Sequence, residues 1–297
     1  MALFWGGCSY TASVTNAVTS TFRDFWDSRD SGIRKRLAVA PFQTPLPQVG
    51  QPRASALGKS VMGELAQKGS LILIDYNQLI DMSQAEPPVK GDPREAMLVA
   101  ARKLGLNAIL SATITDLSMQ QDLTGVYGFR ENTPFLNMEL DLTLVDVASG
   151  VILTEKAFRE QVELTSIQAT NINQGTPPPT ELVDAVTAKL LEPATDWVTE
   201  NLAAQRWAGY ILEKKDNQYL ITVGRDTGLP TGSKVRAYTP GQAIKTGSGQ
   251  TVHVANSPVG WLVIGELMAR TSWATPAPPE GEEKPGNFEV GQVLFSH

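Results

Sequence analysis

Hydrophobic and polar residues alternate almost strictly along residues 136–147. Leucine or methionine occupies every even position from 136 to 144, and the odd positions between them are polar. This alternation predicts a β-strand with one buried face and one face in water. The small residues 148–150 then predict a turn, and residues 151–164 a return strand. Together they form a long antiparallel hairpin.

Short apolar segments and amphipathic segments alternate before this hairpin. Strands are expected at 36–42, 71–74 and 108–115, helices at 56–68 and 94–104, and loops at 43–53 and 85–93. After the hairpin, an apolar stripe predicts a further helix from Thr180 to Leu202. The pattern indicates an α/β (α+β) fold over residues 34–205, with a mixed sheet and flanking helices.

From Trp207 onward, apolar residues recur at every second position. The expected strands are 209–213, 218–223, 233–238, 259–268 and 290–295, with glycine-rich turns between them. Many short strands within some ninety residues are typical of a small closed barrel. We therefore expect a second, all-β domain at residues 206–297, of the SH3-like type, and a separate amino-terminal segment at residues 1–33.

Composition narrows the possible functions. The chain has 297 residues, a formal net charge of −6, one cysteine and two histidines. A single cysteine forms no internal disulfide and no multi-cysteine metal site, and two histidines offer little for zinc binding or acid–base catalysis. The acidic balance argues against nucleic-acid binding. We expect no cofactor, no metal site, no catalytic residue and no nucleic-acid partner.

The amino terminus contains one candidate modification site. An apolar stub runs into Gly6, Gly7 and Cys8, which resembles the end of a bacterial lipoprotein signal with Cys8 as the lipidated residue. Trp5 departs from that pattern, and no basic segment precedes the stub. The alternatives are that the true start lies upstream, or that Cys8 is an ordinary buried cysteine. Lipidation would hold the protein on a membrane through its acyl chains.

Other candidate sites are weak. Residues 58–60 (Gly-Lys-Ser) resemble the end of a phosphate loop but lack its first glycine, so we expect a helix start there. His253 is expected on a strand. Asp141 and Asp146 fall on opposite strand faces, which argues against a carboxylate pair. Glu139 shares a face with Asp141, where both are either solvated or beside a basic residue.

Several aromatic residues are candidates for a protein interface, because aromatic side chains dominate binding hot spots. They are Phe22, Phe25 and Trp26 near the amino terminus and Trp261 and Trp273 in the barrel. For the two barrel residues, packing within the barrel is the alternative. The basic residues 34–36 are expected at a solvated strand edge.

Residues 34–205 resemble the amino-terminal domains of the curli secretion-channel lipoprotein and the Tol periplasmic protein. The landmarks are Ala-Pro-Phe at 40–42, Asp-Tyr at 75–76, Leu-Gly-Leu-Asn-Ala at 104–108 and the segment 142–150, which ends in Ala-Ser-Gly. The glycine pattern of residues 224–235 is similar to the carboxy-terminal barrel of the flagellar H-ring assembly protein.

The resemblance implies a non-catalytic lipoprotein of the periplasm, anchored to the outer membrane. Such a protein would be a ring or scaffold component of an envelope machine, such as a flagellar or surface-fibre apparatus, with protein partners and self-association. The alternative is a curli-type secretion channel, whose membrane hairpins would correspond to residues 119–135 and 160–180. Neither segment has the alternation that a membrane strand requires. An enzyme or ligand-binding module is a third interpretation.

Overall fold

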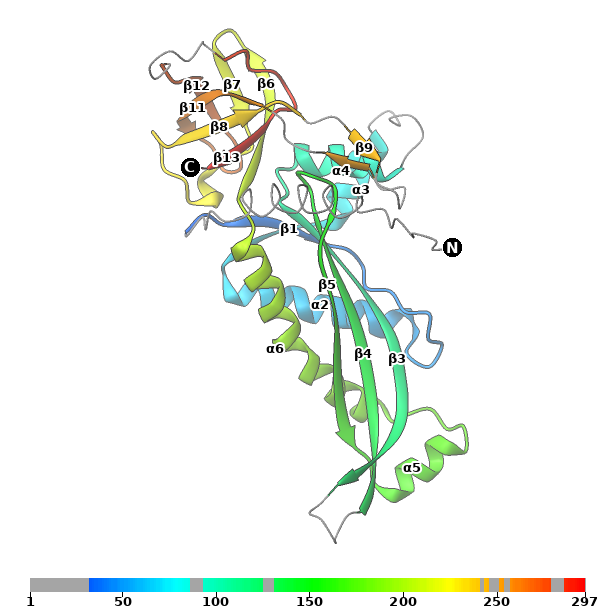
Figure 1. The fold of residues 1–297 in the computed structure, drawn as a ribbon. Coiled ribbons are helices and arrows are strands. Elements are labelled where there is room, and N and C mark those ends of the chain that lie inside the picture. Colours follow the sequence, from blue (N-terminus) through cyan, green and yellow to red (C-terminus); the bar gives the residue numbers. More distant parts are fainter. Residues whose placement is uncertain are drawn as a thin grey trace, which may run out of the picture.

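A mixed five-stranded sheet forms one part of the molecule (Figure 1). The computed structural model describes residues 32–85, 93–124, 131–240, 243–245, 251–253, 257–278 and 286–296. The strands are β1 Lys35–Val39, β2 Leu71–Ile74, β3 Ala108–Thr124, β4 Glu131–Asp146 and β5 Ile152–Glu163, in the order β2-β1-β3-β4-β5. β1 runs parallel to β2 and β3, whereas β3, β4 and β5 are antiparallel neighbours.

Helices flank this sheet. They are α2 Gly50–Lys68, α3 Tyr76–Ala85, α4 Pro93–Lys103, α5 Ser166–Asn173 and α6 Thr180–Ala204. The even-numbered apolar residues of β4 pack with α2 and α6 in the main hydrophobic core. β3, β4 and β5 extend far beyond β1 and β2, with α5 near their distal end (Figure 1).

The second part of the molecule is a closed antiparallel barrel in the order β11-β12-β7-β6-β13-β8. Its strands are β6 Ala208–Lys215, β7 Gln218–Ile221, β8 Lys234–Tyr238, β11 Pro258–Leu267, β12 Ser272–Pro276 and β13 Val293–Ser296. A 3-10 turn, η1 Arg225–Thr227, and a two-stranded ribbon, β9 Ala243–Lys245 with β10 Thr251–His253, complete the described elements. The expected mixed sheet and small barrel are confirmed, while the SH3-like type and the boundary at residue 206 stay predictions.

Several sequence expectations about local structure were wrong. α2 begins at Gly50 instead of residue 56, because Pro52 falls in the first helical turn, where no intrahelical N–H bond is needed. α3 was missed because only Leu79 is fully buried, while the other apolar residues on its inner side, Tyr76 and Met82, are half-buried. β3 continues to Thr124, beyond the expected end at residue 115. A bulge between Ile114 and Asp116 shifts the buried positions from even to odd numbers, which interrupts the alternation visible in the sequence. α5 was also missed, within the segment 160–180.

Sheet and barrel share a second hydrophobic cluster. It includes Ile74, Leu106 and Ile109 from the sheet side and Tyr210 and Phe295 from the barrel. Because these side chains are buried in one cluster, the barrel is fixed at the β1–β2 end of the sheet.

The basic segment 34–36 does not lie at a solvated edge, as the sequence suggested. β1 is an inner strand between β2 and β3, and the side chains of Lys35 and Arg36 are both only 2% exposed. Arg36 binds Asp226 of the barrel through two hydrogen bonds, of 3.0 Å from Nε and 2.9 Å from Nη2. Its Nη2 also donates to the carbonyl of Arg270 at 2.6 Å. Arg36 therefore ties the sheet to two barrel segments.

Lys35 has a related role at the other side of β1. Its Nζ donates to the carbonyl of Leu202 at 2.6 Å and to that of Gln205. These carbonyls lie at the carboxyl end of α6, where the helix dipole favours a positive charge. The charge on Lys35 is thus satisfied where α6 leads into the barrel.

We expect Arg36→Ala to lower the free energy of unfolding by about 3 kcal/mol, because it leaves Asp226 without its bidentate partner in a largely buried place. Chemical denaturation followed by circular dichroism measures this change. Arg34→Ala, at an exposed position two residues earlier, is the matched control and should change stability by less than about 0.5 kcal/mol. Equal effects of the two substitutions would contradict this account of the junction.

Candidate functional site

The distal part of one face of β3, β4 and β5 carries polar side chains, and no described helix packs on it. We call this surface the open face. Nearer β1, Ile109 of β3 shares a hydrophobic cluster with α3 and α4 on that same side. α2, α5 and α6 contribute to the hydrophobic core on the other side of the same strands. The open face consists of Asp116, Ser118 and Gln120 on β3, Asn137, Glu139 and Asp141 on β4, and Ala157, Arg159 and Gln161 on β5.

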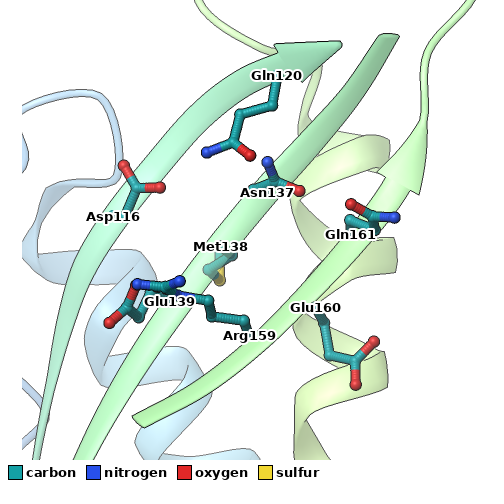
Figure 2. A pocket seen from close by; sticks show the side chains of 8 residues that line it. All are labelled: Asp116, Gln120, Asn137, Met138, Glu139, Arg159, Glu160 and Gln161. Carbon is teal, nitrogen blue, oxygen red and sulfur yellow. Dashed lines mark hydrogen bonds and ion pairs between the residues drawn. The ribbon is translucent and has the colours of Figure 1, made fainter. Parts of the chain in front are cut away.

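Figure 2 shows the hollow at the centre of the open face, which has a volume of about 390 Å³. Asp116 and Gln120 project from β3, Asn137 from β4, and Arg159 and Gln161 from β5. Strand alternation explains why these side chains share one side, since every second residue of a strand points the same way. The hollow is therefore a shallow polar surface built on sheet backbone.

The charged residues of the hollow are coupled. Arg159 Nε donates to Glu139 Oε2 at 2.5 Å, and the Arg159 side chain is 77% exposed while that of Glu139 is 17% exposed. The hydrogen bond and the negative charge of Glu139 raise the pKa of Arg159, with smaller contributions from Asp116 and Asp141. Glu139 thus lies beside a basic residue, the second of the two environments that the sequence left open.

Negative charge dominates this part of the open face. Asp116, Glu139 and Asp141 surround the single Arg159, and Ser118 Oγ donates to Asp116 Oδ2 at 2.7 Å. Three carboxylates near one guanidinium leave a negative potential, which favours a positively charged binding partner.

Three carboxylates line the hollow, those of Asp116, Glu139 and Glu160. Its lining contains no serine, cysteine or histidine that could act as a nucleophile or base. Across the described ranges, no group of three or more histidine, cysteine, aspartate or glutamate side chains could hold a metal ion. The groups present suit polar recognition at a surface.

Two of the five predicted interface residues, Trp261 and Trp273, lie within the described part of the chain. Trp261 on β11 and Trp273 on β12 are half-buried and alternate with residues that fill the barrel, so both point to its outside. The guanidinium of Arg236 lies 5.2 Å from the ring of Trp261. Their role at an interface stays a prediction. The predictions for Cys8, Phe22, Phe25 and Trp26 fall outside the described residues.

Two weaker candidates have structural positions. Residues 58–60 lie inside α2 and not at a helix start, which corrects the sequence expectation. A Cβ on Gly58 would come within 3.3 Å of the Phe42 ring, so the glycine permits close packing there. His253 lies in the strand β10, as expected.

A buried polar network joins the sheet to the segment between α6 and β6. Asp146 accepts hydrogen bonds from Ser149 N at 2.8 Å and from Gln205 Nε2 at 2.5 Å. Asn107 Nδ2 donates to the carbonyl of Ala208 at 3.0 Å, while its Oδ1 accepts from the amide of Arg36 at 2.9 Å. The Asn107 and Asp146 landmarks of the sequence thus hold the junction together.

Asp146 is the carboxylate of this network, and it is enclosed. Burial raises its pKa, against the lowering effect of its hydrogen bonds with Ser149 and Gln205. It lies on the opposite strand face from Asp141, as the sequence indicated. Because Asp146 has no access to solvent, its role is structural.

The sequence contained one unused signal for the open face. Glu139 and Arg159 lie ten residues before and after Ser149, the centre of the predicted turn, so a regular hairpin places them opposite each other. Asp116 gave no such signal, because the bulge in β3 displaces it by one residue from a regular register.

Comparison with known proteins gives no family assignment. No protein-family model matches the chain, and no curated protein matches it either. Within the described ranges, no helix has both the length and the hydropathy needed to cross a membrane.

Solved structures with some similarity include several bacterial lipoproteins. The hypothetical protein CT253 of Chlamydia trachomatis has a TM-score of 0.33 and 11% identity, over 56% of this chain and 98% of its own. For a minor lipoprotein of Acinetobacter baumannii the TM-score is 0.30 and the identity 12%, over 57% of this chain and 94% of the lipoprotein. For the carboxy-terminal domain of Escherichia coli LpoB the TM-score is 0.29 and the identity 17%, over 47% of this chain and 92% of that domain. Similarity at this level assigns neither family nor function.

We expect Asp146→Asn to change how stability depends on pH. A raised carboxyl pKa in the folded state means that the native protein binds more protons than the unfolded chain, starting near the unfolded value of about 3.9. Stability should therefore fall as pH rises from about 4 through the raised pKa, and the Asp146→Asn variant should lack this fall. Urea unfolding at pH 4 to 7 measures it. Asp141→Asn, on the open face, is the matched control and should retain the wild-type fall; a variant at position 146 that also retains it would contradict the assignment.

Proposed function

We propose that this chain is a non-catalytic assembly protein of the cell envelope that binds another protein on its open face. The observation that carries the proposal is the two-sided construction of β3–β5. One side packs against α2 and α6 in the main core, and the distal part of the other side presents a polar, mainly acidic surface with no described helix on it.

The shape and charge of the open face suit a protein better than a small molecule. Small-molecule sites are enclosed and mostly apolar, whereas the hollow around Glu139 and Arg159 is shallow and polar. Complementary charges across an interface raise association rates and specificity. A partner surface with exposed lysine or arginine would therefore fit the carboxylates of Asp116 and Asp141.

The proposed location is the periplasmic side of the outer membrane, with a lipid on Cys8. The Gly-Gly-Cys segment at 6–8 supports the anchor, and the landmarks shared with curli-channel and Tol domains support the envelope. A place in a flagellar or surface-fibre apparatus belongs to the same proposal, supported by the glycine pattern of residues 224–235.

The channel alternative has no supporting observation in the fold. The segment 119–135 supplies the ends of β3 and β4, where Met119 packs against the main core. The segment 160–180 contains the end of β5 and the helix α5, whose Ala169 is buried in that core. We therefore retain the assembly protein alone.

A photo-reactive amino acid at position 120, introduced into the full chain in the organism that makes it, tests the open face. We expect a discrete adduct with a second protein after illumination, because Gln120 is exposed beside the hollow. The matched control places the same amino acid at Gln67, an exposed glutamine of α2 on the other side of the sheet. Asp141→Lys should remove the adduct by reversing a charge of the open face. Identical adducts from both positions, or none from position 120, would contradict the proposal.

Metabolic labelling with a fatty acid tests the anchor. The wild-type chain should incorporate label and fractionate with membranes, because acyl chains partition into lipid, and Cys8→Ala should do neither. Ser9→Ala, at the next residue, should label like the wild type. Equal labelling of the Cys8→Ala variant would contradict the lipid anchor. Binding on the open face would still be tested separately by the photo-crosslinking experiment.

A further inference from the structure

β5 is a long edge strand. It has twelve residues and pairs with β4 along one side only, whereas the strand at the opposite edge, β2, has four residues. An edge strand presents backbone N–H and C=O groups to any chain that can pair with it. A strand as long as β5 is therefore a candidate surface for strand addition.

The hydrogen bonds fix which residues of β5 point outward. Asp146 N donates to the carbonyl of Val151, and Leu164 N to that of Pro134. Even-numbered residues of β4 therefore turn their backbone groups toward β5 and bond its even-numbered residues, in the register Leu140–Phe158. Odd-numbered residues of β5 turn their N–H and C=O groups away from the sheet.

A side-chain contact supports this orientation. Lys189 of α6 donates from Nζ to the carbonyl of Gln161 at 2.7 Å, which requires that carbonyl to lie on the outer side of β5. For Glu155, Ala157 and Arg159, the described hydrogen bonds include no backbone partner on that side. All three are exposed residues.

Two opposite charges of β5 lie at equal distances on either side of Phe158. Lys156 lies two residues before Phe158, and Glu160 two residues after it. Edge strands often carry charges that prevent pairing, because like charges meet when two copies align. Here an antiparallel copy centred on Phe158 would bring opposite charges together instead.

We propose that two copies of this chain pair through β5, antiparallel, with the two-fold axis at Phe158. Lys156 of each copy then faces Glu160 of the other copy, which gives two such pairs, in the closely spaced non-hydrogen-bonded positions. Ala157 pairs with Arg159 of the second copy, and Glu155 with its Gln161. These pairs supply about eight backbone hydrogen bonds. Lys189 releases the Gln161 carbonyl to the amide of the opposing Glu155.

Neighbouring registers fit less well. An axis at Arg159 would place the two Arg159 guanidinium groups opposite each other and Glu155 opposite Glu163, so like charges would meet at each of these positions. An axis at Ala157 would place Glu155 opposite Arg159 of the second copy twice, but the Arg159 guanidinium already binds Glu139 of its own chain. Glu160 would then face Thr154, without a positive partner. The charge pattern therefore selects the axis at Phe158.

The paired arrangement joins two five-stranded sheets into one continuous sheet. Both open faces then lie on the same side of that sheet, because a two-fold axis perpendicular to the sheet preserves its sides. The inference rests on the edge of β5 and not on the proposed function, and neither experiment above reports on it.

Disulfide trapping tests the register. Glu155→Cys and Gln161→Cys are made separately in full chains that carry Cys8→Ser, then mixed and oxidised. In the proposed register these positions are directly opposite, within the reach of a disulfide, so the mixture should form a covalent dimer. Each variant alone should not, since its own copies are roughly 20 Å apart across the axis. A mixture of Glu155→Cys with Arg159→Cys that links faster would place the axis at Ala157 and overturn the register, and no link in any mixture would overturn the interface.

Charge exchange tests the interface without cysteines. Sedimentation equilibrium of the full chain with Cys8→Ser should show a dimer. Lys156→Glu or Glu160→Lys should weaken it about tenfold, because each places like charges opposite each other twice. The double variant Lys156→Glu/Glu160→Lys should restore the affinity, which a loss of folding could not do. A monomer at all concentrations, or a double variant as weak as the single ones, would contradict the proposal.

Discussion

The two-sided nature of β3, β4 and β5 is the constraint on which the rest of the structure depends. A strand cannot change which side chain faces the core without a bulge or a register shift. Leucine and methionine at the even positions of β4 bind the sheet to α2 and α6, and the odd positions are thereby committed to the other side. The open face is a direct consequence of how the core is filled.

The barrel is joined to this sheet by charge as well as by apolar contact. Lys35 and Arg36 are buried, and burial of an unpaired charge would cost several kcal/mol. Each is satisfied by atoms outside β1: Lys35 by the end of α6, and Arg36 by Asp226 and the carbonyl of Arg270. The same strand therefore orders the first core and positions the barrel, so the two parts depend on each other for their stability.

The sequence predicted the features that depend on local periodicity. The hairpin around Ser149, the helices at 94–104 and 180–202, and the barrel strands were visible because each buries one regular face. Features that depend on tertiary context were not visible. α3 fully buries only Leu79, and the bulge after Ile114 interrupts the alternation of β3.

The candidate site was predicted in part for the same reason. Glu139 and Asp141 were placed together on a polar face by counting along one strand. Arg159 and Asp116 come from neighbouring strands, so their position depends on register across the hairpins. The basic segment at 34–36 was misjudged because nothing local distinguishes a charge at an edge from one paired to a residue 190 positions away in the chain.

Backbone geometry also connects the open face with the edge of β5. The odd residues of β5 carry the side chains of the open face, and the same residues turn their backbone groups outward. Arg159 is the point where both surfaces meet: its guanidinium binds Glu139 on the open face, while its N–H and C=O belong to the edge. Pairing at the edge would fix the backbone of Arg159. It would thereby limit the motion of the Arg159 side chain, which lies among the carboxylates of the open face. The proposed binding surface uses the side chains of these residues and the proposed pairing uses their backbone groups, so the two would be linked through the peptide backbone itself.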